Sequence, residues 1–99
     1  MLLIIGTIRL PPDRLELAKP VMQRMILASR VEPGCLSYSY AQDVLDARLI
    51  HVSEAWSDRA ALEAHFKSRH IAEWRARWAE LGICDRKLTL YETDGGAPT

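Results

Sequence analysis

Residues 35–56 read CLSYSYAQDVLDARLIHVSEAW, and this stretch decides the fold. Over residues 35–42 the large side chains fall on every second position, which is the period of a β-strand with one large-residue face. Residues 43–47 have the polar character of a hairpin connection, and residues 48–56 resume the alternation. The stretch therefore predicts two neighbouring antiparallel strands.

The residues before the hairpin predict a strand and a helix. Leu2 to Arg9 is rich in β-branched residues and ends before Pro11-Pro12, so we expect a strand whose first half is apolar on both faces. Such a strand belongs in the middle of a sheet. From Asp13 to Val31 apolar and small residues recur every three or four positions, which is typical of an amphipathic helix. Pro20 removes one backbone hydrogen bond within it, so we expect a kink or a break near Lys19.

The residues after the hairpin predict a helix in two pieces and a last strand. Ser57 is a good N-cap for a short first piece, and Ser68 resembles a second cap. The second piece ends at Gly82, and Arg86 to Thr93 alternates as the fourth strand. The apolar stripe of the second piece consists of Ile71, Trp74, Trp78 and Leu81.

The element order β-α-β-β-α-β predicts an α+β, ferredoxin-like fold. Right-handed crossovers give a four-stranded antiparallel sheet in the order four, one, three, two, with the helices on one face. The length suits one domain over residues 1–94, followed by a mobile tail at residues 95–99. Cys35 and Cys84 then lie on opposite edge strands, so we expect two reduced, half-buried thiols and no disulfide.

Both faces of the expected sheet carry apolar side chains, yet the helices cover only one face. The second face needs a cover, and the simplest cover is the same face of a second copy. We therefore expect a homodimer in which two sheets pack together as a barrel.

Composition excludes several classes of partner. The 13 basic and 13 acidic residues cancel and are interspersed, so no electrostatic footprint for nucleic acid or for a membrane surface is present. The longest apolar run, Met1 to Ile5, is far shorter than the roughly 20 residues that span a bilayer, and no signal peptide pattern surrounds it. We expect a cytoplasmic protein.

Two segments resemble the antibiotic biosynthesis monooxygenase (ABM) domain family. The first is EPGCLSY at residues 32–38, and the second begins with EAWS at residues 54–57. The second segment continues with Leu62, His65, Ser68 and His70.

The resemblance implies a dimeric α+β barrel and, for the enzymes of the family, oxidation of quinol-type or polycyclic aromatic substrates by molecular oxygen without metal or flavin. Some relatives degrade haem with an Asn, a Trp and a His. The corresponding places here hold Thr7, His65 and Arg75 or their neighbours, so we expect no haem role. The expected cofactor is therefore none, with oxygen as co-substrate.

A cofactor-free oxygenase needs a base, hydrogen-bond donors and a dry apolar wall. Histidine is the side chain best suited to proton transfer near neutral pH, so His65 and His70 are the candidate catalytic residues. The candidate residues for substrate binding are Tyr38, Glu54, Trp56, Phe66 and Trp74.

Each candidate also has a structural interpretation. His65 is in register with Leu62, so it could equally be a core histidine bonded to the backbone or to Glu54. His65 and His70 are five apart across an expected helix break and no third ligand is evident, so we expect no metal site. The tryptophans could be core residues rather than a stacking surface.

The leading hypothesis is a cofactor-independent monooxygenase acting on a quinol or polyphenolic aromatic. One alternative is a non-catalytic protein that binds a small ligand in the same barrel, which is favoured if side chains fill the space between sheet and helices. Another is an isomerase or decarboxylase, which also needs only a base and a pocket.

Overall fold

The structure is a computed structural model that describes residues 1–99. The order of its elements confirms the β-α-β-β-α-β arrangement, but the second helix is in three pieces rather than the predicted two, because the piece that begins at residue 69 is interrupted at Arg77. The bounds are β1 Leu2–Arg9, η1 Pro12–Arg14, α1 Leu15–Arg30, β2 Cys35–Gln42, β3 Leu49–Trp56, α2 Arg59–Phe66, α3 Arg69–Ala76, α4 Trp78–Leu81 and β4 Cys84–Glu92.

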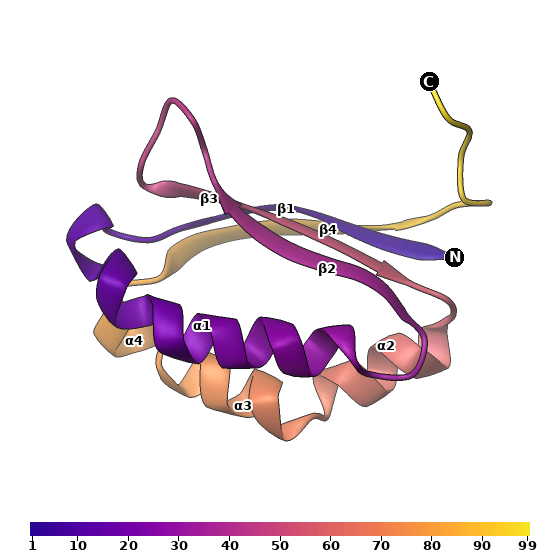
Figure 1. The fold of residues 1–99 in the computed structure, drawn as a ribbon, viewed down its shortest axis with the longest axis horizontal. Helices are drawn as coiled ribbons and strands as arrows, with labels where there is room; N and C mark the ends of the chain where they lie inside the picture. Colours follow the sequence, from indigo (N-terminus) through magenta and orange to yellow (C-terminus); the bar gives the residue numbers. More distant parts are fainter.

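The four strands form one antiparallel sheet in the order β2-β3-β1-β4, which confirms the predicted order. All helices lie on one side of this sheet, and the other side carries no helix (Figure 1). The hydrophobic core lies between these two layers and takes side chains from both. No helix of the chain is both long enough and apolar enough to cross a membrane.

The central strand β1 pairs with β3 on one side and with β4 on the other. Gly6 allows the close approach of β4, because a Cβ atom at this position would lie 1.9 Å from the Lys87 carbonyl oxygen. Leu3 pairs with Ala55 of β3 and with Tyr91 of β4, so these three side chains are neighbours on the face without helices.

The predicted break near Lys19 is wrong, because α1 runs from Leu15 to Arg30 with Pro20 inside it (Figure 1). Pro20 is exposed, and so is Glu16, whose carbonyl loses its partner. Water can therefore satisfy that carbonyl, and the helix continues. The predicted helical start at Asp13 is instead a short 3-10 turn that precedes α1.

The predicted N-cap of α2 is wrong by one residue. The cap is Asp58, whose carboxylate accepts a hydrogen bond of 2.8 Å from the Ala61 backbone N–H. Ser68 does precede α3, but its hydroxyl donates to the His65 carbonyl at 2.6 Å instead of capping the following helix.

The C-terminal strand begins at Cys84, two residues earlier than predicted. Cys35 and Cys84 lie on the two edge strands as free thiols, but Cys84 is exposed rather than half-buried because it begins the outer strand β4. The mobility of residues 95–99 stays a prediction.

Candidate functional site

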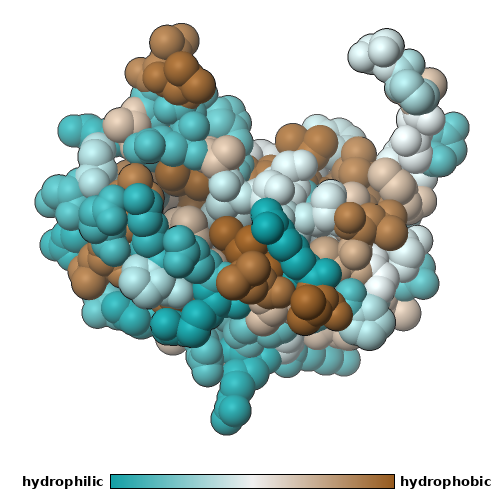
Figure 2. All heavy atoms as spheres, viewed as in Figure 1, coloured by the Kyte–Doolittle hydropathy of each residue, from teal (hydrophilic) through white to brown (hydrophobic).

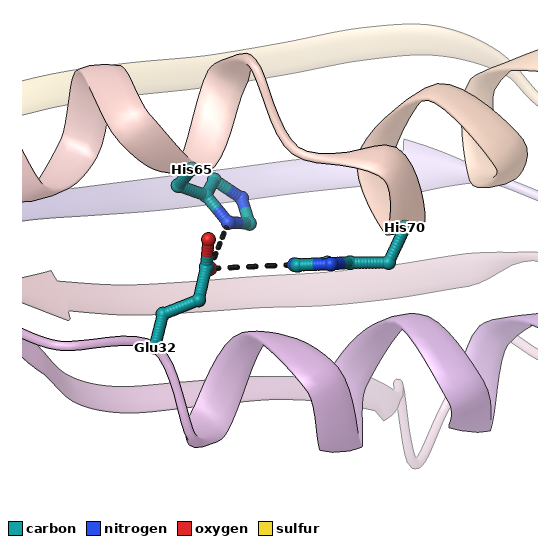
Figure 3. Close-up of side chains that lie close together, drawn as sticks. All are labelled: Glu32, His65 and His70. Carbon is teal, nitrogen blue, oxygen red and sulfur yellow. Dashed lines mark hydrogen bonds and ion pairs between the residues drawn. The ribbon is translucent and has the colours of Figure 1, made fainter.

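Three side chains meet where α1, α2 and α3 approach one another: Glu32, His65 and His70 (Figure 3). The Glu32 Oε2 atom lies 2.6 Å from His65 Nδ1 and 3.4 Å from His70 Nε2. Glu32 lies two residues after the end of α1, His65 lies in the last turn of α2, and His70 lies in the first turn of α3. The break between α2 and α3 lets both imidazole rings turn toward one carboxylate.

His65 is the most enclosed of the three, with its side chain 2% exposed. Its ring lies 4.6 Å from the Trp56 ring and 5.3 Å from the Tyr38 ring, measured between centroids. Burial lowers the pKa of the His65 imidazole, and the Glu32 carboxylate opposes this shift. A carboxylate can only accept hydrogen bonds, so the pairing places the ring proton of His65 on Nδ1 and leaves Nε2 with a free lone pair.

His65 is paired with Glu32 and not with Glu54, in contrast to one of the interpretations of the sequence. Glu54 lies on β3 and accepts a hydrogen bond of 3.0 Å from the Trp56 indole N–H. Burial raises the pKa of the Glu54 carboxyl, while the Trp56 hydrogen bond and the Arg86 and Arg75 charges oppose the shift. The site therefore contains a buried acid and a separate buried imidazole.

A small space lies between the sheet and the α2–α4 side of the helical layer. Its volume is about 20 Å³, which is room for roughly one water molecule. The residues that line it are Ile4, Tyr38, Tyr40, Glu54, His65, Phe66, Ile71, Trp74, Arg75, Trp78, Arg86 and Leu88. Side chains therefore almost fill the space in this conformation.

The lining offers several hydrogen-bond donors. The indole N–H groups of Trp74 and Trp78 are buried and have no acceptor. Burial raises the pKa values of the Tyr38 and Tyr40 phenols, so both keep their protons at neutral pH. Such donors suit a ligand that carries oxygen acceptors, because a buried N–H without a partner is costly.

Four of the five residues predicted for substrate binding line this space, together with His65: Tyr38, Glu54, Phe66 and Trp74. Trp56 does not, because it is fully buried behind His65 and Glu54. His70 also lies outside the lining and faces Glu32.

Sequence reasoning did not assign a site role to Glu32, Arg75 or Arg86, and it favoured structural roles for Tyr40 and Trp78, which also line the space. A signal existed for Glu32, which stands in the motif at residues 32–38, and for Tyr40, which shares a strand face with Tyr38. No spacing rule pointed to the two arginines, since one is on α3 and the other on β4.

Comparison with known proteins places this geometry in a family. The family model described as antibiotic biosynthesis monooxygenase matches residues 1–77. The chain belongs to the ABM family. The match covers β1 through α3 and so includes the Glu32, His65 and His70 cluster.

Two curated relatives are about equally similar to this ABM chain. An uncharacterised protein of Synechocystis is 31% identical over 91 residues, which cover 92% of this chain and 62% of that protein. The protein named "Putative monooxygenase Rv0793" of Mycobacterium tuberculosis is 31% identical over 70 residues, which cover 71% of this chain and 68% of that protein. The chain thus spans less than two thirds of the Synechocystis relative.

Solved structures confirm the ferredoxin-like ABM fold. A Deinococcus radiodurans structure described as a "putative antibiotic biosynthesis monooxygenase" superposes with a TM-score of 0.90 at 21% identity, over 100% of this chain and 98% of that one. PA3566 of Pseudomonas aeruginosa superposes with a TM-score of 0.82 at 30% identity, over 93% of this chain and 92% of that one.

Proposed function

We propose that this ABM protein is a cofactor-independent monooxygenase acting on a quinol or polyphenolic aromatic. One observation carries the proposal: a buried histidine, held at Nδ1 by a carboxylate, lines a space walled by aromatic side chains. His65 Nε2 is then the atom that can take a proton from a phenolic hydroxyl in that space.

The chemistry balances without a further reductant. A quinol and O₂ give a hydroxyquinone and water: one oxygen atom enters a ring C–H bond, and oxidation of the quinol to the quinone supplies the electrons that reduce the other. Loss of the phenolic proton to His65 makes the ring electron-rich enough to pass an electron to O₂. The proton held by His65 then helps the second oxygen leave as water.

The other residues of the lining would contact the substrate ring and the negative charge that develops on it. Trp74 and Trp78 present unpaired indole N–H groups, and neither Arg75 nor Arg86 forms an ion pair. These donors and charges suit the phenolate oxygen that develops during the reaction. Glu54, whose pKa is raised by burial, is a second titratable group on the sheet side of the space.

The small volume of the space sets a condition on the proposal. A substrate ring needs a larger opening than about 20 Å³, so it must displace side chains. Phe66 and Arg75 are exposed members of the lining, so their displacement would cost less packing than that of the buried members.

Side chains fill most of the space, which counts against substrate entry in this conformation. The alternative, a non-catalytic protein that binds a small ligand in the barrel, needs the same displacement of side chains. An oxygen electrode with metal-free protein and reduced quinones separates the two. We expect oxygen uptake that His65→Asn abolishes, since asparagine can still donate to Glu32 but cannot accept a proton. The exposed His51 is the matched control, and His51→Ala should keep the parent rate. Quinol binding without oxygen uptake would favour the alternative.

We also propose that the chain forms a homodimer through the face of the sheet that carries no helices. Ile5 and Tyr91 on that face are 47% and 52% exposed. The tip of the β2–β3 hairpin projects to the same side (Figure 1) and forms an apolar knob (Figure 2), where Val44 and Leu45 are 97% and 95% exposed. A second copy would bury both the face and the knobs.

Equilibrium sedimentation tests the dimer. Ile5→Lys places a charge in the centre of the open face and should give a species of one chain's mass, because a buried unpaired charge is costly. Leu17→Lys is the matched control, since Leu17 is 54% exposed but lies on α1. A parent protein of one chain's mass, or an Ile5→Lys variant that stays dimeric, would refute the proposed interface.

A further inference from the structure

The cluster of Glu32, His65 and His70 has the composition of a metal site. Two imidazole nitrogens and a carboxylate oxygen lie within 4.8 Å of one another (Figure 3). The expectation of no metal site depended on the absence of a third ligand near the two histidines, and Glu32 supplies that ligand. Two histidines and one carboxylate bind Zn²⁺ in hydrolytic enzymes and Fe²⁺ in oxygenases.

The separations suit one shared ion. Ligand atoms at about 2.1 Å from an ion lie roughly 3.0 to 3.4 Å from one another in octahedral or tetrahedral geometry. The distances from Glu32 Oε2, 2.6 Å to His65 Nδ1 and 3.4 Å to His70 Nε2, bracket that range. The ligand atoms of the two histidines lie within 4.8 Å of each other, so the two rings must turn toward each other to share one ion.

His70 supplies the independent observation. Its Nε2 atom is buried but makes no hydrogen bond, although Glu32 lies only 3.4 Å away. A buried polar atom without a partner is uncommon in folded proteins, and such an atom is often one that binds a water molecule or an ion. Ligation of a cation would use this nitrogen and also the carboxylate that now lies between the two rings.

An ion can reach the cluster and keep an open coordination position. The Glu32 and His70 side chains are 16% and 20% exposed. A surface groove of about 380 Å³ runs beside Glu32 along the turn at Pro33 and Gly34 and the start of α2. Water from this side can complete the coordination shell, as at metal sites with three protein ligands.

We propose that Glu32, His65 and His70 bind one divalent transition-metal ion per chain, with Zn²⁺ as the probe. Binding through His65 Nδ1 would move the ring proton to Nε2, which then donates and can no longer accept. Occupancy would therefore switch off the proton transfer described above. This loss of proton transfer rests on the proposed monooxygenase function, whereas metal binding itself does not.

Calorimetric titration of chelator-treated protein with Zn²⁺ tests the site. We expect one ion per chain, with affinity at least 10-fold weaker in Glu32→Gln and in His70→Ala. Co²⁺ should give the visible spectrum of a nitrogen- and oxygen-ligated ion in the parent and lose it in both variants. Circular dichroism verifies that each variant is folded, and His70→Gln replaces His70→Ala if the latter is not.

His51→Ala is the matched control, because His51 also contacts a carboxylate, at 2.7 Å from Asp43, but lies on the hairpin away from the cluster. It should bind Zn²⁺ as the parent does. No binding by the parent, equal affinity in Glu32→Gln and the folded His70 variant, or loss of binding in His51→Ala would overturn the proposal. Oxygen uptake is measured separately on metal-free protein, so a parent protein that binds Zn²⁺ but shows no uptake when metal-free would refute only the monooxygenase.

Discussion

Replacing Glu32 and His65 by alanine, singly and together, measures how strongly the two side chains are coupled. The His65 side chain is 2% exposed, and its Nδ1 atom lies 2.6 Å from the Glu32 carboxylate. A hydrogen bond to a charged group contributes about 1.5–3 kcal/mol, and truncation of a large buried side chain leaves a cavity that costs about 2 kcal/mol or more. His65→Ala should therefore lower the free energy of unfolding by about 4 kcal/mol.

The Glu32 variant and the double variant complete a double-mutant cycle, which isolates the interaction energy between the two side chains. The Glu32 side chain is more exposed, at 16%, and leaves a smaller cavity, so we expect Glu32→Ala to cost about 2 kcal/mol. The double variant should cost less than the sum of the single variants by about 1.5–3 kcal/mol, which is the coupling energy of the pair.

Urea unfolding at one fixed protein concentration measures all four proteins, since stability depends on concentration if the chain dimerises. Glu73→Ala is the control and should leave the midpoint nearly unchanged, because Glu73 is exposed on α3 and lies away from the sheet face proposed for the dimer. Additive costs, within about 0.5 kcal/mol, would refute the reasoning that Glu32 and His65 act as one unit.

Four further predictions concern the rest of the fold. Burial raises the pKa of the Glu54 carboxyl, so its negative charge destabilises the folded state at pH values above the ordinary carboxyl pKa of about 4.3. Glu54→Gln should therefore raise the melting temperature at pH 8 and leave it unchanged near pH 4, and a lower melting temperature at pH 8 would contradict this. Gly6→Ala should cost about 3 kcal/mol or more in urea unfolding, because its Cβ would overlap a β4 carbonyl oxygen; a stable variant would refute that packing. Asp58→Ala should cost about 1 kcal/mol in the same assay through loss of the N-cap, and an unchanged midpoint would argue against it. Cys84 should react with a thiol reagent well before Cys35, since Cys84 is exposed while burial and a nearby carboxylate raise the pKa of Cys35; equal rates would be inconsistent with this burial.

The sequence predicts the layers of this fold well because the alternation of side chains is strong where it matters. The apolar first half of β1 indicates a central strand, and the handedness of crossovers then fixes the sheet order. The predicted break in the first helix is wrong because solvent exposure decides whether a proline interrupts a helix. Pro20 does not break α1, because the carbonyl that loses its partner comes from an exposed residue, and no local pattern reveals that exposure.

The site is only partly predictable from the sequence. The register with Leu62 correctly indicates that His65 is buried, but its partner Glu32 is 33 residues away on a turn. The i, i+4 rule for paired histidine ligands assumes one continuous helix, whereas a break between α2 and α3 brings His70 to the same carboxylate. Contacts between turns and helix ends depend on tertiary packing, which spacing along the chain does not encode.

Incorporation of oxygen from ¹⁸O₂ is the most direct test of the proposed chemistry. Metal-free protein is mixed with a naphthoquinol under ¹⁸O₂, and the masses of the products are measured by mass spectrometry. We expect a hydroxynaphthoquinone that carries one ¹⁸O atom, formed much faster than without protein and not formed by His65→Asn. Product at the rate of the protein-free reaction, or at the same rate with His65→Asn, would contradict it.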